Sequence, residues 1–255
     1  MSGVGEYTNR LWNLSADKPI PRTFFVFRKF SGRLEKTLKP AEKTRINILD
    51  EITNALPDFN SVFHPVSNGF DVEGPVDFEL ETGQAEFVKK QIPIVSSGEI
   101  PISSGKKDIY PAENKFYPSN FGYLRIPYKN NVIAVINVHG LTFRPDDKLD
   151  TPERLEQSRL IKEFATKENG PVIICGDFNV FPQTQSIIMF EDKFVNLIKK
   201  YGVSTTRSKI SPWHGTPREL KFSDYTFVSP EIEVLGFSAP DIEISDHLPL
   251  VIEFR

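Results

Sequence analysis

The sequence predicts an α/β (α+β) fold in which β-sheets pack against each other and helices cover them from outside. Segments of strand type outnumber segments of helix type along the 255 residues, and the helical segments are short and scattered. Because a sheet buries its apolar face against another layer, this balance favours packed sheets with helices on their outer faces. The length suffices for a sizeable core, and we expect one domain over residues 1–255.

The first part of the chain contains few regular elements. Residues 1–40 form an irregular segment rich in Lys, Arg and Pro, with one strand-like run at Phe24–Phe27. A helix is predicted from Ala41 to Leu56, where apolar residues recur at helical spacing and Pro57 ends the pattern. Short strand-type runs follow at residues 61–63, 86–88 and 92–95. Residues 96–120, dense in Ser, Gly, Pro and Lys, predict a long loop.

The periodic signal is stronger in the second half. Residues 122–126 and 132–138 predict a hairpin. The next helix is predicted to begin with Thr151 as its N-cap and Pro152 at its first position, and to end at Gly170. The remaining predicted elements are a buried strand at 171–175, a helix in two pieces at 184–201, and strands at 225–228 and 248–254.

Composition limits the class of protein. The formal net charge of −3 argues against a broadly basic surface for nucleic acid, although 31 Lys and Arg residues leave room for a short basic groove. No run of about 18 apolar residues occurs, and residues 1–6 lack the features of a secretory signal. The single Cys175 excludes an intrachain disulfide and is interpreted as a small buried apolar residue. We therefore expect an intracellular, cytoplasmic monomer with no transmembrane segment.

Three polar clusters stand where predicted strands end or begin, the position at which rigid scaffolds present reactive side chains. They are Asn137–Gly140, Gly176–Asn179 and Ser245–Pro249. Asp177 and Asp246 are hard oxygen donors suited to Mg²⁺, or bases able to orient a water molecule. Asn179 offers an amide to a phosphate or a water. Each cluster alone is also typical of a turn or a helix cap, but all three at strand ends favour a functional site.

Two histidines belong to these clusters. His139 and His247 can hold or move a proton near neutral pH, and as cations they would stabilise a phosphate in its transition state. A catalytic imidazole usually needs a carboxylate to fix its tautomer, and Asp224 is the candidate partner of His247. His64 and His214 are interpreted as structural or surface residues.

Together these motifs resemble the endonuclease/exonuclease/phosphatase superfamily, which includes DNase I. The motifs that carry the resemblance are Asn-Val-His ending at His139, Gly-Asp-Phe-Asn at 176–179, Ser-Asp-Tyr at 223–225 and Ser-Asp-His-Leu-Pro at 245–249. The resemblance extends from about Gly122 to Arg255. It implies a four-layer α/β/β/α sandwich with two mixed β-sheets face to face. It also implies hydrolysis of a phosphate ester with Mg²⁺, or alternatively Mn²⁺, as cofactor.

The resemblance also implies a role for each candidate residue. Asp177 orients or deprotonates the attacking water, Asn179 binds the phosphate, His247 held by Asp224 contacts the scissile phosphate, His139 stabilises the phosphate or the leaving oxygen, and Asp246 lies near the metal. Which of these groups is the general base stays open.

The sequence departs from the family pattern at its beginning. Family members usually open with a strand ending in Asn and a strand ending in Gln-Glu, whose Glu is the principal metal ligand, and neither is found in this sequence. Glu6 is a far better candidate for a surface residue than for a substitute. We therefore expect an N-terminally incomplete domain in which Asp246, Asp177 and water bind the ion weakly. The alternative is a catalytically inactive phosphate-binding or interaction module.

The substrate stays undecided between nucleic acid and a lipid headgroup. The run Arg207–Lys221 contains Trp213, which could stack on a nucleobase if the run forms a loop over the cleft, whereas an apolar rim would suit a lipid. An ordinary surface loop is the alternative interpretation.

Overall fold

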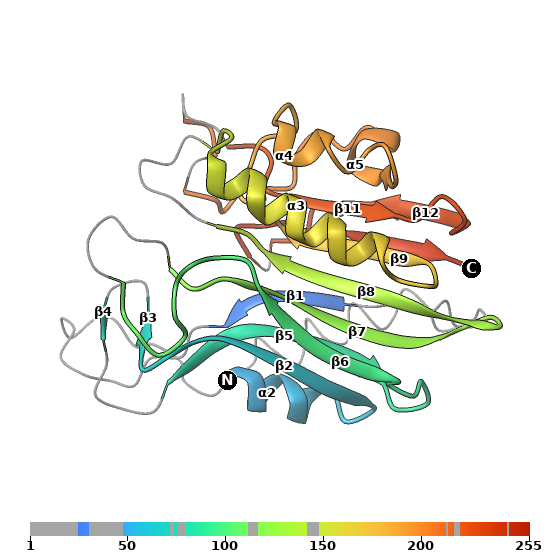
Figure 1. Ribbon diagram of the computed structural model, residues 1–255, viewed down its shortest axis with the longest axis horizontal. Helices are drawn as coiled ribbons and strands as arrows, with labels where there is room; N and C mark the ends of the chain where they lie inside the picture. The colour runs from blue at the N-terminus through green and yellow to red at the C-terminus, as the bar shows by residue number, and fades with distance from the viewer. Residues whose placement is uncertain are drawn as a thin grey trace.

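The computed structural model describes residues 25–30, 48–71, 74–75, 80–111, 117–141, 148–212, 214–216, 220–243 and 245–255. Two β layers lie at the centre, and helices cover them from both sides (Figure 1). The predictions made for residues 1–24 and 31–47, and for Trp213, lie outside the described residues.

The larger sheet has six strands in the order β10-β11-β9-β8-β7-β6. Its strands are β6 (Ser96–Pro101), β7 (Asn120–Tyr128), β8 (Asn131–His139), β9 (Val172–Asp177), β10 (Val195–Asn196) and β11 (Asp224–Val228). The sheet is mixed, because β8 and β9 run parallel and the other neighbours are antiparallel. The predicted hairpin is the β7–β8 pair. Its turn contains Lys129 in the left-handed region at φ 52°.

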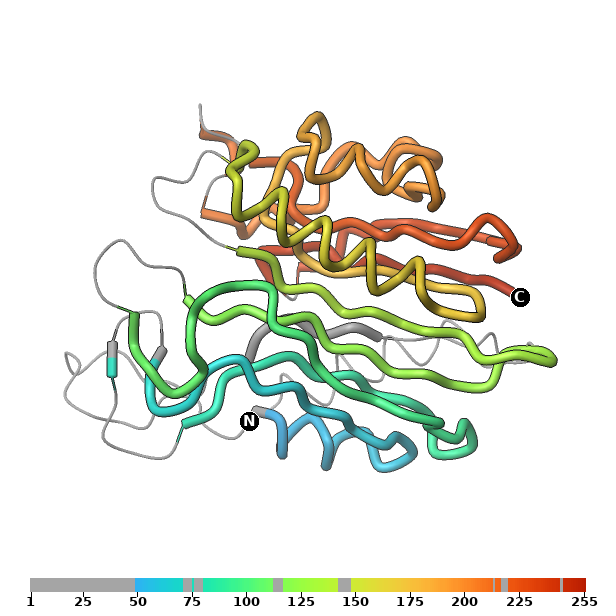
Figure 2. The backbone as a smooth tube through the Cα atoms, in the orientation of Figure 1, coloured from blue at the N-terminus to red at the C-terminus, as the bar shows by residue number. Residues whose placement is uncertain are grey.

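Short helices cover one face of this sheet (Figure 2). They are α3 (Pro152–Thr166), α4 (Gln185–Ile188) and α5 (Leu197–Lys200). The N-cap prediction is confirmed, since Thr151 accepts a hydrogen bond from the backbone N–H of Arg154 at 3.3 Å. Ile161 of α3 and Ile187 of α4 are fully buried against the sheet. The two-piece helix predicted at 184–201 corresponds to α4 and α5, with β10 between them.

The second β layer faces the other side of the large sheet. It contains β1 (Phe25–Phe30), β5 (Glu81–Lys89) and β2 (Phe59–Asn68) in the order β1-β5-β2, and the pair β12 (Val234–Ser238) and β13 (Val251–Phe254). Val88 of β5 and Phe254 of β13 belong to one apolar cluster against the large sheet. The helix α2 (Ile48–Ala55) covers the outer face of β5 and β2. A small hairpin, β3 (Phe70–Asp71) and β4 (Gly74–Pro75), completes the described elements.

Alternation along the strands divides the large sheet into a helix-facing and a sheet-facing surface. Ile136 and Ile174 pack toward α3, whereas their neighbours Val135 and Ile173 pack toward the second β layer. Side chains two and four residues after Val135 in β8, and after Ile173 in β9, also point toward the second β layer. The register of β11, β9 and β8 therefore places three polar side chains in one row, where the space between the two β layers ends. They are Asp224, Asp177 and His139.

The structure differs from the sequence predictions in four places. Residues 92–95 were predicted as a strand but lie in a loop, and the strand β6 begins at Ser96 inside the predicted loop. Pro93 has no N–H for a ladder, and Ile92 packs against the core from the loop instead. The strand β12 was not predicted, and among the described strands only the larger sheet is mixed. No helix in the described ranges is long and apolar enough to cross a membrane.

Candidate active site

The strand order brings three polar residues to one edge of the large sheet. Asp177 is the last residue of β9 and His139 is the last residue of the parallel neighbour β8, and the two are register partners. Asp224 is the first residue of β11 and pairs with Asp177 across the antiparallel ladder. Asp177 is fully buried, and His139 is half-buried. Adjacent strands thus place two carboxylates and an imidazole side by side.

His247 reaches the same edge from the C-terminal segment. An isolated antiparallel bridge joins it to Arg207, and the N–H of Leu248 donates to the carbonyl of Thr206 at 2.9 Å. The hydroxyl of Thr206 in turn accepts the backbone N–H of Asp224 at 3.3 Å. This short pairing fixes His247 over the beginning of β11.

The imidazole of His247 is held by the carboxylate of Asp224. Nδ1 lies 2.6 Å from Oδ2, and the two side chains are only 11 % and 10 % exposed. The contact fixes the plane of the ring and leaves Nε2 on the opposite side, 3.5 Å from Oδ2 of Asp246. An imidazole oriented through Nδ1 can present Nε2 to a reacting group.

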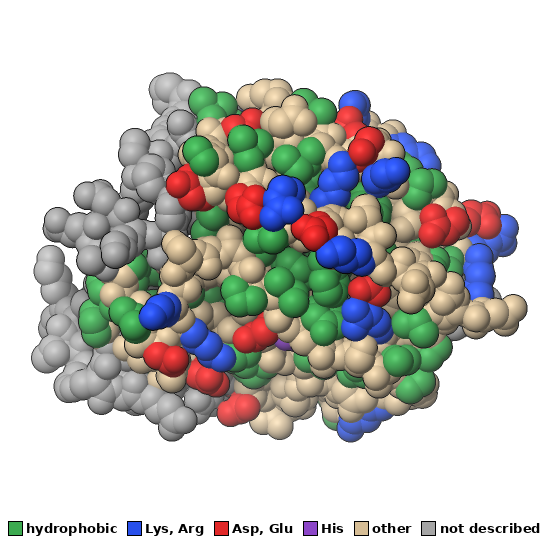
Figure 3. Space-filling view, in the orientation of Figure 1, with side chains coloured by type: hydrophobic (Ala, Val, Ile, Leu, Met, Phe, Trp, Pro, Cys, Tyr) green, Lys and Arg blue, Asp and Glu red, His purple; other side chains and the backbone are tan. Residues whose placement is uncertain are grey.

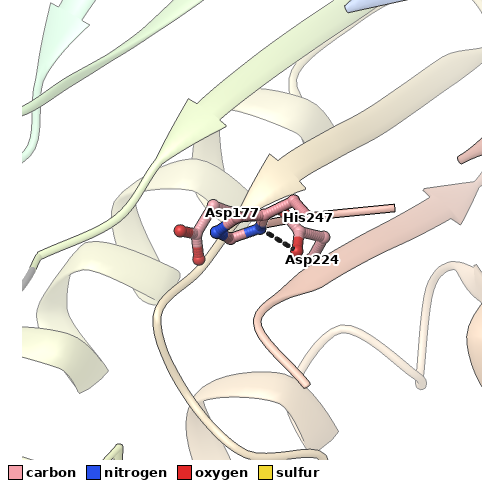
Figure 4. A group of neighbouring side chains, drawn as sticks. All are labelled: Asp177, Asp224 and His247. Carbon is pink, nitrogen blue, oxygen red and sulfur yellow. Dashed lines mark hydrogen bonds and ion pairs between the residues drawn. The ribbon is translucent and has the colours of Figure 1, made fainter. Parts of the chain in front are cut away.

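Asp177, Asp224 and His247 form one compact group (Figure 4). One ligand atom of each lies within 4.8 Å of the others. Two carboxylates and an imidazole fit a divalent cation such as Mg²⁺ or Mn²⁺ chemically, because carboxylate oxygens suit both ions. The imidazole of His247 lies between the two carboxylates, so the group is equally suited to proton transfer.

The loop after β9 fixes the carboxylate of Asp177. Its Oδ1 accepts the backbone N–H of Asn179 at 2.7 Å, and Asn179 adopts a left-handed conformation at φ 55°. The side-chain amide of Asn179 donates to the carbonyl of Gly140 at 3.0 Å, which joins this loop to the end of β8. Gly176 has φ 128°, and a Cβ there would lie 2.2 Å from the carbonyl oxygen of Val138. The Gly-Asp-Phe-Asn motif therefore has a steric requirement as well as a polar one.

Sequence reasoning missed a buried cation beside Asp177. Lys148 is 2 % exposed, and its Nζ donates to Oγ of Ser223 at 2.8 Å. Oγ of Ser223 lies 2.5 Å from Oδ1 of Asp177. Because an ammonium group only donates, the hydroxyl hydrogen of Ser223 is directed to the carboxylate. No sequence signal pointed to Lys148, since it ends a polar run that is typical of a surface loop.

A second missed cation contacts Asp246. Nη1 of Arg207 lies 2.5 Å from Oδ2 of Asp246, and Nη2 lies 3.4 Å from Oγ of Ser223. The side chain of Arg207 is 12 % exposed and that of Asp246 is 44 % exposed. Asp246, the predicted metal ligand, thus lies next to the group formed by Asp177, Asp224 and His247 but is paired with a guanidinium.

Two other residues lie away from this edge. His64 is buried, with Nε2 2.8 Å from Oε2 of Glu86, and both belong to the second β layer. Cys175 lies two residues before Asp177, and burial raises the pKa of its thiol to about 12. Cys175 was interpreted as a small buried apolar residue; in the structure it is partly buried and packs against the apolar core.

Comparison with known proteins gives the same architecture. Residues 101–247, more than half of the chain, match the model of the Endonuclease/Exonuclease/phosphatase family. A search of curated protein sequences finds no match. The fold is the four-layer DNase I-like α/β/β/α sandwich.

Among solved structures, three similar ones are an endonuclease/exonuclease/phosphatase family protein from Leptotrichia buccalis, one from Bacteroides thetaiotaomicron and the catalytic domain of human Nocturnin with bound sulfate. The first is 14% identical with a TM-score of 0.62, covering 91% of this chain and 86% of that chain. The second is 21% identical with a TM-score of 0.58, covering 81% and 76%. The third is 17% identical with a TM-score of 0.54, covering 82% and 76%. At these identities the likeness concerns the fold.

Proposed function

The chain belongs to the endonuclease/exonuclease/phosphatase family, and from this premise we propose that it hydrolyses phosphate esters with a divalent metal ion, Mg²⁺ or Mn²⁺. The observation that carries the proposal is the group of Asp177, Asp224 and His247, whose ligand atoms lie within 4.8 Å of one another at the strand ends. Acidic groups and an oriented imidazole at one point supply both a base for water and a donor for phosphate oxygen.

Asp177 is the residue we propose to orient or deprotonate the attacking water. Hydrogen bonds from Asn179 and Ser223 to the same oxygen fix the plane of its carboxylate. A fixed carboxylate loses little orientational freedom when the water binds, which lowers the barrier for attack. We propose that the amide of Asn179 lies beside the phosphate.

His247 is proposed to contact the scissile phosphate through Nε2. Its Nδ1 is held by Asp224 at 2.6 Å, and this carboxylate stabilises the imidazolium form. His139, the register partner of Asp177, is proposed to stabilise the phosphate or the leaving oxygen from the neighbouring strand. The two imidazoles then approach the phosphoryl group from the end of β8 and from the C-terminal segment.

Asp246 and Asp177 are the residues proposed to hold the metal. A bound divalent ion supplies Lewis-acid polarisation of a phosphoryl oxygen. Asp246 is partly exposed and has one oxygen on Arg207, so the guanidinium has to yield that oxygen or share it. The substrate is proposed to be a phosphate ester of nucleic acid or of a lipid headgroup.

The test uses bis(p-nitrophenyl) phosphate, whose hydrolysis releases a coloured product. We expect turnover with Mn²⁺ or Mg²⁺ that EDTA removes. Asp177→Ala and His247→Ala should each lower turnover by about 100-fold. The matched control is Asp192→Asn, which removes one carboxylate charge from an exposed pair with Lys162 on the helical face and should leave turnover unchanged. The proposal would be contradicted if turnover persisted in EDTA and if His247→Ala also left turnover unchanged.

A catalytically silent phosphate-binding module is the second candidate, and the Arg207–Asp246 contact favours it. A guanidinium already supplies the positive charge that an ion would bring to Asp246. This alternative predicts no turnover of the diester with either metal. It also predicts that inorganic phosphate binds in EDTA, with an affinity that His247→Ala reduces.

A further inference from the structure

Lys148 adopts a backbone conformation that is rare for a lysine. It lies just before α3, and its φ of 52° is in the left-handed region, where a Cβ is crowded against the backbone. Its carbonyl accepts the N–H of Phe181 at 2.9 Å, which joins it to the loop that follows Asp177. Strained conformations of this kind persist where the surrounding structure fixes them, and they are frequent at functional sites.

The residues after Lys148 fix its position in the fold. The carbonyl of Leu149 accepts Nη1 of Arg154 at 2.7 Å, in the first turn of α3. The carboxylate of Asp150 accepts the first two N–H groups of α4 at 2.7 and 3.0 Å. These contacts hold the backbone at Lys148 between two helices, so its side chain has little freedom in where it can reach.

The ammonium group of Lys148 is buried against the strand ends. The residue is 2 % exposed, and its Nζ donates to Oγ of Ser223 at 2.8 Å and to the carbonyl of Phe222 at 3.3 Å. A buried ammonium group is costly unless an opposite charge lies near it. The carboxylate of Asp177 supplies such a charge, fully buried on the other side of the Ser223 hydroxyl.

The hydroxyl of Ser223 therefore has a fixed direction. Its oxygen accepts from Lys148 and lies 3.4 Å from Nη2 of Arg207, and both cations can only donate. Its hydrogen is thus directed to Oδ1 of Asp177, 2.5 Å away. Oδ1 also accepts the N–H of Asn179, so two donors hold this oxygen in place. These contacts also set the direction of the other oxygen, Oδ2.

On the basis of the proposed hydrolysis, we propose that Lys148 is a positioning residue for this reaction and acts on Asp177 through the hydroxyl of Ser223. The ammonium group fixes the hydroxyl, the hydroxyl fixes Oδ1, and Oδ2 is held toward the attacking water. Lys148 makes no contact with the substrate in this role. Loss of its charge should therefore slow the chemical step without weakening substrate binding.

The experiment is a double-mutant cycle on the turnover of bis(p-nitrophenyl) phosphate by the full chain. Lys148→Met keeps the length of the side chain and removes its charge, and Ser223→Ala removes the hydroxyl. Each should lower kcat by about tenfold at unchanged KM. The double variant should also lose only about tenfold, because both substitutions break the same path. A loss of about a hundredfold in the double variant, or an unchanged kcat in Lys148→Met, overturns the proposal.

The matched control is Lys162→Met, which removes the cation of an ion pair with Asp192 on the helical face. Its kcat and KM should equal those of the parent protein.

A second cycle needs no turnover. Lys148→Met leaves the buried carboxylate of Asp177 without this balancing cation, so the midpoint of urea unfolding should fall. In the Asp177→Asn background that carboxylate is gone, and Lys148→Met should lower the midpoint by less than about half as much. Equal losses in the two backgrounds overturn the proposal whether or not the chain is an enzyme. Unequal losses in a parent protein that lacks turnover support the link between Lys148 and Asp177 and contradict the proposed hydrolysis instead.

Discussion

In the part of the chain that the structure describes, His247–Asp224 and His64–Glu86 each pair an imidazole with a carboxylate, and they differ in where they lie between the β layers. His247 and Asp224 lie 2.6 Å apart at the strand ends, with side chains 11 % and 10 % exposed. His64 and Glu86 lie 2.8 Å apart inside the sandwich, each 4 % exposed. The chemical groups are the same, but only the first pair lies at the strand ends that form the candidate active site. We therefore propose a catalytic role for the first pair and a structural role for the second, from their positions along the strands.

The pair His64–Glu86, called the inner pair, belongs to a group of polar side chains between the β layers, next to the edge that carries the candidate active site. His64 packs on Gly122 of the large sheet, where a Cβ would lie 2.2 Å from its Cδ2. Beside it, Nε2 of Gln84 donates to both the carbonyl and the side-chain oxygen of Asn120, at 2.8 and 2.9 Å. Two residues further along β5 than Glu86, Val88 already belongs to the apolar core. The side chains between the two β layers are therefore polar near the candidate active site and apolar further from it.

The largest expected effect comes from removing the inner carboxylate. Glu86→Ala leaves His64 buried without its partner, and the free energy of unfolding should fall by about 3–5 kcal/mol. Urea unfolding followed by circular dichroism measures this loss. The matched control is Glu163→Ala on the surface of α3, where acidic and basic side chains are interspersed (Figure 3). This substitution should lower the free energy of unfolding by less than about 1 kcal/mol.

The double variant His64→Leu/Glu86→Leu sharpens the same comparison. It replaces both members by apolar side chains, so no buried charge is left alone, and most of the lost stability should return. A double variant as unstable as Glu86→Ala would show that the pair has a role beyond mutual compensation.

The next effect concerns the outer pair and is seen in turnover. Asp224→Asn can donate from its amide to Nδ1 of His247 and thereby favour the wrong tautomer. Turnover of bis(p-nitrophenyl) phosphate should fall by about 100-fold, while stability falls less than in Glu86→Ala. Asp192→Asn is the control for loss of one carboxylate. If Asp224→Asn keeps its turnover, the outer pair has no part in proton transfer.

Much of this site could be predicted from the sequence because its residues stand next to strong strand signals. Asp177 follows the apolar run of β9, and Asp224 precedes that of β11, so their convergence needs only the pairing of two strands. The partner of His247 could be proposed because a catalytic imidazole needs a carboxylate. The hairpin β7–β8 and the helix cap at Thr151 were predictable from local turn and cap residues alone.

The supporting cations could not be predicted in this way. Lys148 and Arg207 reach the site from loops whose sequence has no periodicity, and Ser223 connects them only in three dimensions. Similarly, β6 contains Ser, Gly and Pro, and its pairing with β7 comes from the backbone ladder and not from a strand-like composition. Long-range contacts of this kind leave no local pattern in the chain.

A smaller effect tests the packing between the layers. Gly122→Ala forces its Cβ against His64, and the free energy of unfolding should fall by about 1–3 kcal/mol. Gly236→Ala in β12 is the matched control, because its Cβ meets only ordinary contacts at 4.0 Å and should cost less than about 0.5 kcal/mol. Combining Gly122→Ala with His64→Ala should give less than the sum of the single effects. Additive losses would mean that the two residues do not meet in solution.

The smallest effect uses Cys175 to report on the inner carboxylate. Burial is the main cause of its raised pKa of about 12, and the negative charge of Glu86 adds to it. A raised pKa means less thiolate at a given pH, so the native protein should react with a disulfide reagent at pH 8 far more slowly than the unfolded chain. Glu86→Gln removes the nearby charge, lowers the pKa and should speed labelling slightly at pH 9, whereas Asp224→Asn should not. If both variants accelerated labelling equally, labelling would follow local opening of the structure. The electrostatic difference expected between Glu86 and Asp224 would then be contradicted.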